Sequence, residues 1–218
     1  PDKASFKEAW IQYYQPRDIA EERLYTVMTV DPALSEKGDY NGIIVTGTST
    51  DNTTYLLDSI KIRGDLSTIV DRIFQVYEKH RPDVVGVEMY GFQKFLKFWL
   101  EEEMSKRNIF FSIVQLEAGQ KKSKSMRILA LQPKIEVGKV KFRRHEDMEL
   151  ISQLLSFDYS RRDNDDDMID AFAYQVSIWR PPDAGNKPSA PAGSFDIIVS
   201  EADKIQAPQQ GYIQRLFS

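Results

Sequence analysis

The sequence predicts an α/β domain with a central mixed sheet of about five strands and helices on both faces. Two observations carry this prediction. Three apolar, β-branched segments come first in meander order, and the later strands then alternate with segments of helical periodicity. A meander followed by alternating strands and helices is typical of a mixed sheet with helical layers. The expected strands are 24–30, 42–50, 54–62, 83–89 and 109–116, and the expected helices between them are 67–80 and 92–107.

Each expected strand is a short apolar run with a defined end. Residues 24–30 end at Asp31-Pro32, where proline stops the ladder. Segments 42–50 and 54–62 flank the polar cluster TDNT and form a hairpin. The run DVVGVEM at 83–89 is apolar apart from Glu88. Each of the first and fourth strands therefore carries one carboxylate at its end.

The rest of the chain adds three features. Residues 119–144 are rich in Lys and Arg and are expected to contain a short helix and a small strand near Val140–Phe142. Two more helices are expected at 147–156 and 167–179. From Pro181 the sequence PPDAGNKPSAPAGS is typical of a linker, so we expect residues 182–218 to form a linker and tail.

Composition excludes several classes of protein. The chain has 218 residues and no cysteine, which rules out disulfides, Cys-ligated zinc, iron–sulfur clusters and a thiol nucleophile. Its two histidines are far apart, which disfavours a histidine metal site. Its net charge of −4 would by itself disfavour a nucleic-acid partner. We find no signal peptide or membrane span, and the start at Pro1 leads us to expect a piece of a longer chain.

Carboxylates gather where apolar elements end. Asp31 ends the first strand, Glu88 the fourth, and the acidic run 163–170 opens the last helix. Taken singly, Asp31 fits a turn and the acidic run fits a helix cap. If the first and fourth strands are parallel neighbours, however, their carboxylates emerge together and repel unless a cation is bound. Oxygen ligands without Cys or His select Mg²⁺ or Mn²⁺, and two such ions are the usual device for phosphodiester hydrolysis.

Five sequence motifs, in order and in register across residues 6–180, resemble the nuclease domain of the large terminase subunit of tailed bacteriophages, which has an RNase H-like fold. They are VDPALSEKGDYNGIIV (30–45), YLLD (55–58), VVGVEMYGFQ (84–93), KKSKSMRILALQP with GKVKF (121–133, 138–142) and DDDMIDAFAYQ (165–175). The leading FKEAWIQYY resembles the family's connection from the ATPase motor. The resemblance thus implies an approach segment at 1–24 and a nuclease domain at 25–181.

The resemblance also implies roles for single residues. Asp31 and Glu88 match the family's metal-binding acids, and the pattern DD-x-x-DA falls on Asp166, Asp167 and Asp170. Asp167 and Asp170 are three residues apart and could share a helix face. Asp167 is our first choice as the third catalytic acid. Asp166, Asp167 and Asp170 are all candidate metal ligands. Asp39 matches an acid that supports these ligands, although a plain turn aspartate is an equal alternative. Asp165 stands where many relatives have histidine.

A basic block at 120–145 is the predicted DNA contact. It holds nine Lys and Arg residues against one acid, Glu136. Such clusters neutralise phosphates without reading sequence. A solvated surface segment is the simpler explanation for any single lysine, but the block as a whole favours phosphate contact. The candidates are Lys121, Lys122, Lys124, Arg127, Lys139, Lys141, Arg143 and Arg144.

The implied function is cleavage of double-stranded DNA by two Mg²⁺ or Mn²⁺ ions during viral genome packaging. The implied partners are an upstream ATPase domain, the portal and the small terminase subunit, in the host cytoplasm without membrane contact. The chain has no G-x-x-x-x-G-K-[ST] motif for ATP. Three alternatives remain. The first is a Holliday-junction resolvase or RNase H, and the second is a non-catalytic DNA- or portal-docking module. The third is a sugar-kinase-like or actin-like domain, but the chain has too few glycines for its phosphate-binding hairpins.

Overall fold

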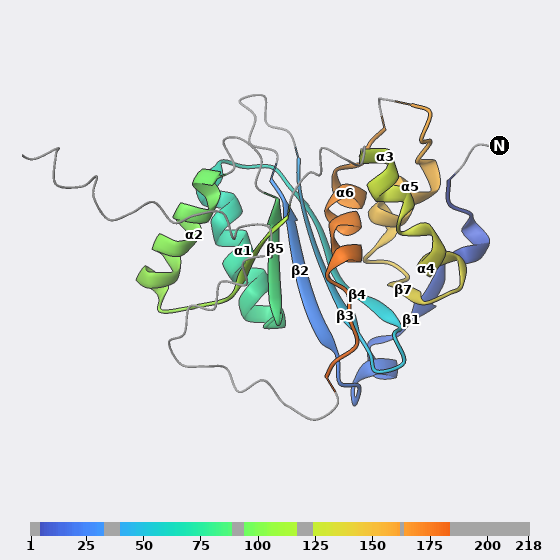
Figure 1. The fold of residues 1–218 in the computed structure, drawn as a ribbon, viewed down its shortest axis with the longest axis horizontal. Coiled ribbons are helices and arrows are strands. Elements are labelled where there is room, and N and C mark those ends of the chain that lie inside the picture. Colours follow the sequence, from blue (N-terminus) through green and yellow to red (C-terminus); the bar gives the residue numbers. More distant parts are fainter. Residues whose placement is uncertain (1–4, 33–39, 89–93, 117–123, 162–163, 184–218) are drawn as a thin grey trace, which may run out of the picture.

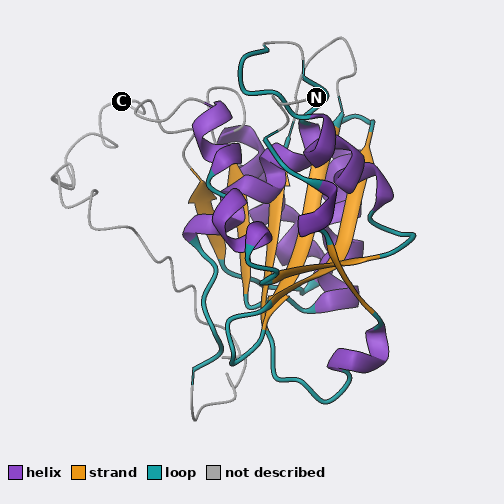
Figure 2. Cartoon of the chain, turned by 90° about the vertical axis from the view of Figure 1, so that its right-hand side faces the viewer, coloured by secondary structure: helices purple, strands orange, loops and turns teal. Residues whose placement is uncertain are grey.

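Seven strands form one mixed sheet in the computed structural model, which describes residues 5–32, 40–88, 94–116, 124–161 and 164–183 (Figures 1 and 2). Their spatial order is β1-β7-β4-β3-β2-β5-β6. The antiparallel meander β2-β3-β4 forms the centre; β5 and β6 extend it parallel to β2, and β7 and β1 extend it parallel to β4. The expected mixed sheet is confirmed. The strands are β1 (Gln12–Tyr14), β2 (Tyr25–Asp31), β3 (Asn41–Thr48), β4 (Thr54–Ile62), β5 (Val84–Glu88), β6 (Ile113–Leu116) and β7 (Val140–Arg143).

Helices cover both faces of this sheet, as expected (Figure 1). α1 and α2 pack on one face around buried residues such as Val30 and Ile73. α3 to α6 lie over the other face, where Ile44 and Phe172 belong to a second apolar cluster. No helix within the described ranges is long and apolar enough to cross a membrane. The helices are α1 (Leu66–His80), α2 (Lys94–Arg107), α3 (Lys124–Leu129), α4 (Gln132–Glu136), α5 (Met148–Ser156) and α6 (Asp167–Tyr174), with 3₁₀ turns at Glu8–Trp10, Pro16–Ile19 and Gln175–Ser177.

The segment before residue 24 packs onto the same sheet. Phe6 is buried with its ring 6.5 Å from that of Phe157, measured between centroids. β1 pairs with β7, and the Tyr14 hydroxyl donates a hydrogen bond of 2.5 Å to the Leu56 carbonyl of β4. The described residues before 24 therefore contact the expected nuclease domain, and the boundary at residue 24 stays a prediction.

Helix α6 approaches β3 closely because the strand has no side chain at Gly42. A Cβ atom there would lie 2.5 Å from the Asp167 carbonyl oxygen and 2.9 Å from the Ala171 Cβ atom. Two buried polar side chains fix this approach. The Thr29 hydroxyl donates to the Ala171 carbonyl at 2.7 Å, and the Gln175 amide donates to the Ile44 carbonyl at 2.9 Å. The start of α6 is thereby held directly over the centre of the sheet.

Gln153 of α5 caps the start of α6. Its side-chain oxygen accepts hydrogen bonds from the Met168 and Ile169 backbone N–H groups, at 3.0 and 3.3 Å. Its amide nitrogen donates to the Asp165 carboxylate at 3.1 Å. Gln153 is buried, so these helix N–H groups have this side chain as their acceptor in place of water. The cap orders the segment that carries the acidic run.

We expect Gly42→Ala to lower the free energy of unfolding by about 1–3 kcal/mol, because backbone atoms of α6 must move to admit the new methyl group. Urea unfolding monitored by circular dichroism measures this. Gly86→Ala is the matched control, since its Cβ would meet only the flexible end of the Leu116 side chain, at 2.8 Å. Equal losses in the two variants would contradict a special role for the α6 approach.

We expect Gln153→Leu to destabilise the protein by about 2 kcal/mol, because it leaves two buried helix N–H groups without an acceptor. The measurement is again urea unfolding. Ser152→Ala changes an exposed residue of the same helix and should alter stability by less than about 0.5 kcal/mol. A Gln153→Leu variant as stable as this control would show that the cap contributes nothing.

Candidate active site

The sheet register places Asp31 and Glu88 side by side. β2 and β5 are parallel neighbours with Val30 opposite Val87, so the next residues are the two acids at the strand ends. Val30 and Val87 point into the α1 and α2 layer, and alternation therefore turns Asp31 and Glu88 toward α6. The prediction that these two carboxylates emerge together is confirmed.

Asp31 and Glu88 form a tight acidic pair. Burial raises the pKa of Asp31 well above its usual range, and so do a hydrogen bond with Glu88 and the negative charges of Asp170 and Glu88. Glu88 itself is buried, with 9% of its surface exposed. Two carboxyl groups this close together concentrate negative charge at the ends of β2 and β5, where a bound cation would be favoured.

Asp170 of α6 is the third acid close to this pair. Its side chain is 6% exposed, and its Oδ1 accepts from the Arg127 Nε and Nη2 atoms at 2.9 and 2.6 Å. Lys124 Nζ lies 3.4 Å from the other carboxylate oxygen. Burial raises the pKa of Asp170 despite these two cations, and the charge of Glu88 adds to the rise.

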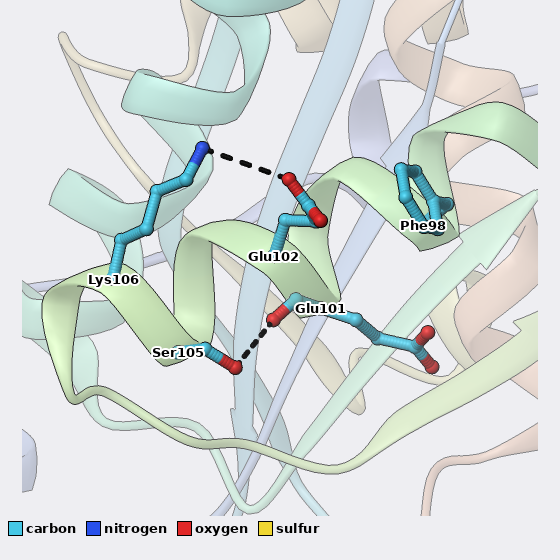
Figure 3. Close-up of a pocket in the computed structure, with 5 residues that line it drawn as sticks. All are labelled: Phe98, Glu101, Glu102, Ser105 and Lys106. Atoms are coloured by element: carbon cyan, nitrogen blue, oxygen red, sulfur yellow. Dashed lines mark hydrogen bonds and ion pairs between the residues drawn. The ribbon is translucent and has the colours of Figure 1, made fainter.

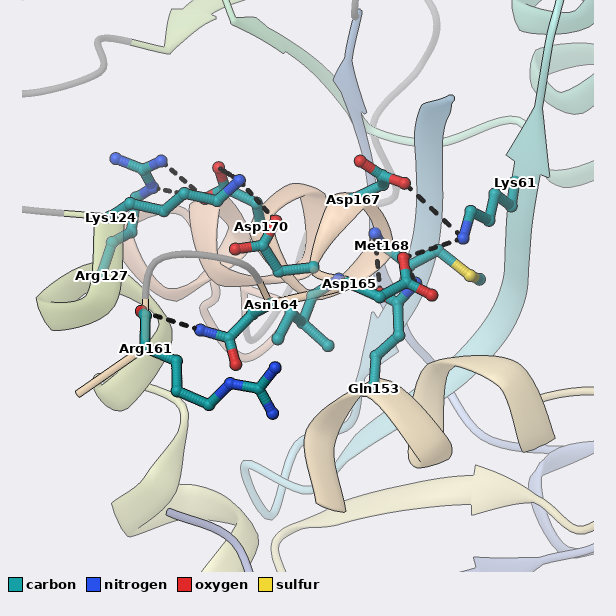
Figure 4. A network of polar contacts seen from close by, with 12 residues as sticks. Lys61, Lys124, Arg127, Gln153, Arg161, Asn164, Asp165, Asp167, Met168 and Asp170 are labelled. Atoms are coloured by element: carbon teal, nitrogen blue, oxygen red, sulfur yellow. Dashed lines mark hydrogen bonds and ion pairs between the residues drawn. The ribbon is translucent and has the colours of Figure 1, made fainter. Parts of the chain in front are cut away.

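The acidic run before Asp170 divides between two cations (Figure 4). Asp166 Oδ1 lies 2.7 Å from Lys124 Nζ, on the same side of α6 as Asp170, four residues on. Asp167 Oδ2 and Asp165 Oδ1 instead lie 3.6 and 3.0 Å from Lys61 Nζ. Asp167, our first choice from the sequence, thus faces Lys61, whereas Asp170 is the acid whose charge acts on Asp31.

Lys61 is a site residue that the sequence reasoning missed. It lies in register with Gly42, which in turn pairs with Asp31, so it occupies the same level of the sheet as the acidic pair. Only 10% of its side chain is exposed, and Glu149 Oε1 lies 3.3 Å from its ammonium group. A lysine between two isoleucines at the end of the strand was the available signal.

Tyr174 was also missed. It follows Asp170 by four residues, and this spacing places the two side chains on one helix face. Its ring lies 4.3 Å from the Arg127 guanidinium. Among the described residues its buried hydroxyl has no hydrogen-bond partner of good geometry, although Glu88 lies near it; burial and then the interaction with the Glu88 carboxylate raise its pKa.

The residues present fit a hard divalent cation. Within the described parts of the chain, no three acids or histidines already stand at ligand spacing, and Asp170 is bonded to Arg127 instead. The acids that meet here, Asp31, Glu88 and Asp170, offer only oxygen ligands, and the buried Tyr174 hydroxyl lies near Glu88. These features fit Mg²⁺ or Mn²⁺, with Asp31, Glu88 and Asp170 as the ligands available to hold it.

The structure does not bring the predicted basic block together. Lys124 and Arg127 lie at the acids. Lys121, Lys122 and the predicted supporting acid Asp39 fall outside the described residues. The other four candidates lie in β7 or directly beside it. β7 pairs with the start of β4, away from the end of β4 that lies level with Asp31.

These four side chains have local partners. Lys139 Nζ lies 2.9 Å from Asp51 in the hairpin turn. Arg143 Nη2 lies 2.6 Å from the fully buried Asp147 and is an internal residue rather than a surface contact. Lys141 and Arg144 lie over the rings of Tyr55 and Tyr13. The described members of the basic run therefore lie in two separate places, and their contact with DNA stays a prediction.

A shallow hollow on the exposed side of α2 contains none of the predicted site residues (Figure 3). The Ser105 hydroxyl donates to the Glu101 carbonyl at 3.1 Å, and Lys106 Nζ lies 3.7 Å from Glu102. The hollow is lined by Phe98, Glu101, Glu102, Ser105 and Lys106.

Several solved nuclease domains of terminases have a similar fold. The nuclease domain of the large terminase subunit gp2 of bacterial virus Sf6, a K428A mutant with manganese and beta-thujaplicinol, has a TM-score of 0.58 at 11% identity, covering 79% of this chain and 98% of that one. The large terminase nuclease of thermophilic phage G20c with bound magnesium has a TM-score of 0.54 at 18% identity, covering 78% and 86%. The human cytomegalovirus terminase nuclease domain, Mn soaked and inhibitor bound, has a TM-score of 0.50 at 12% identity, covering 82% and 93%.

No curated protein matches the chain by sequence. The family model described as the terminase RNaseH-like domain does match, over residues 28–177. That range runs from β2 through α6 and contains Asp31, Glu88 and Asp170. The chain therefore belongs to the terminase RNaseH-like domain family.

Proposed function

We propose that this chain is an endonuclease that hydrolyses double-stranded DNA with bound Mg²⁺ or Mn²⁺, two ions in the working site, during viral genome packaging. The observation that carries the proposal is the pair of half-buried Asp31 and buried Glu88 at the carboxyl ends of parallel strands, with buried Asp170 of α6 near it. Family membership supports a nuclease role. Terminase nucleases with this fold have been solved with magnesium or manganese.

We assign Asp31, Glu88 and Asp170 as the catalytic acids. The contacts around α6 favour Asp170 over Asp167, because Asp170 lies near the pair while Asp167 is held by Lys61. Asp166 shares Lys124 with Asp170 and is the next candidate ligand. Asp39 remains a predicted supporting acid.

Each group then has a defined task. When bound, the divalent ions supply a water activated for in-line attack on phosphorus and charge to stabilise the leaving oxygen. Asp31 and Glu88 would hold a divalent ion through their carboxylate oxygens. Arg127 keeps Asp170 oriented through two hydrogen bonds to one oxygen. Lys124, at the mouth of the site, lies where a DNA phosphate can be contacted.

The proposed setting is the packaging motor of a virus in its host's cytoplasm. The proposed partners are double-stranded DNA, an ATPase domain upstream in the same polypeptide, the portal and the small terminase subunit. Family membership supports DNA as the substrate.

We expect Asp31→Asn, Glu88→Gln and Asp170→Asn each to lower the cleavage rate by about 100-fold or more, because each removes a charged oxygen ligand. The measurement is nicking and linearisation of supercoiled plasmid with Mg²⁺ or Mn²⁺, with EDTA abolishing both. Asp167→Asn is the matched control on the same helix and should lower the rate far less.

Isothermal titration with Mn²⁺ separates ligand loss from misfolding, since the three variants should stay folded and bind the ion more weakly. Full cleavage by any of them would contradict the assignment. Faster cleavage of four-way junctions than of linear duplex would favour a junction resolvase, and cation-independent cleavage would overturn the proposal.

A further inference from the structure

Lys124 and Arg127 both neutralise the acids of α6, but their freedom to move differs. Lys124 is the first residue of α3, and 46% of its side chain is exposed. Arg127 is one turn further on, and 16% of its side chain is exposed. Both side chains contact Asp170, but Lys124 has more room to leave it than Arg127 has.

Arg127 is locked in place. Its Nε and Nη2 atoms both bond to Asp170 Oδ1, and its guanidinium lies 4.3 Å from the centre of the Tyr174 ring. Tyr174 is itself buried in α6. Moving Arg127 out would break two charged hydrogen bonds and expose this ring, so Arg127 stays with Asp170 whatever else binds.

Lys124 is held by carboxylates alone. Its ammonium group lies 2.7 Å from Asp166 Oδ1 and 3.4 Å from Asp170 Oδ2, and its charge also acts on Asp31. Among the described residues, no aromatic ring lies under its ammonium group, in contrast to the Arg127 guanidinium over Tyr174. Its partners are acids that border the proposed metal site, so a divalent ion bound there would compete with the ammonium for the same negative charge.

We propose that Lys124 is an exchangeable cation: it neutralises Asp166 and Asp170 in the metal-free site, and divalent ions release it to contact a DNA phosphate. This inference rests on the proposed function and adds an order of binding, in which divalent ions bind before Lys124 contacts the DNA. Because coupling between two ligands is reciprocal, divalent ions and DNA strengthen each other's binding through Lys124.

The first test is titration of Mn²⁺ into the DNA-free protein. We expect Lys124→Met to bind Mn²⁺ several-fold more tightly than wild type, because the competing ammonium group is gone. Lys124→Gln, which keeps a polar side chain, should behave in the same way. Equal or weaker Mn²⁺ binding by both folded variants would overturn the proposal.

The second test is the salt dependence of duplex binding, measured by fluorescence anisotropy with Ca²⁺ and with EDTA. Ca²⁺ takes the same oxygen ligands, and a gel verifies that the duplex stays intact. With Ca²⁺, Lys124→Met should lower the slope of log affinity against log salt by about one, the value of one phosphate contact. With EDTA the slope should not change. A loss of equal size in both conditions would overturn the exchange.

Lys106→Met is the matched control. Lys106 also bridges two carboxylates, with Glu103 at 3.0 Å and Glu102 at 3.7 Å, but it lies on α2, over the other face of the sheet (Figure 1). It should leave Mn²⁺ affinity unchanged. If wild type itself bound no divalent ion and cut no DNA, the proposed function would fail; if it did both and Lys124→Met matched Lys106→Met, only the exchange would fail.

Discussion

The close packing of α6 on the centre of the sheet is the contact on which the site depends. Glu88, Asp31, Gly42 and Lys61 stand in one row across four adjacent strands, β5, β2, β3 and β4. The row has charged side chains except at Gly42, where the missing side chain admits the backbone of α6. Any larger residue at that position would raise the helix away from the acids below it. The absence of a side chain at Gly42 thus sets how near Asp170 comes to Asp31.

The helical period then gives the acids of α6 different surroundings. Asp166 and Asp170, four residues apart, meet Lys124, and Arg127 adds to Asp170. Asp167, rotated around the helix axis, meets Lys61. Cations on both sides of the helix allow an acidic run to stay folded at this place, because unpaired buried carboxylates would be costly.

Net charge was a poor guide to the partner of this protein because it averages opposed features. The chain carries −4 overall, yet five acids fall within the short run 163–170 and nine bases within the block from 120 to 145. The tertiary structure divides that block again. Lys124 and Arg127 join the acids, whereas Arg143 is used internally with Asp147. Electrostatic function follows from where each charge lies, which a sum cannot report.

The sequence by itself determined the elements of the fold and the acids at two strand ends. Apolar runs with a period of two or 3.6 report burial directly, and Asp31 and Glu88 stand out because a charge interrupts such a run. It did not reveal β1, before residue 24, because three residues carry too little pattern to predict a strand. Only the tertiary structure decided that Asp170 rather than Asp167 approaches the pair, that Lys61 and Tyr174 lie beside these acids, and that the described part of the basic block divides. The physical reason is that these outcomes depend on strand register and on the rotation of α6 over Gly42, which are relations between segments far apart in the chain.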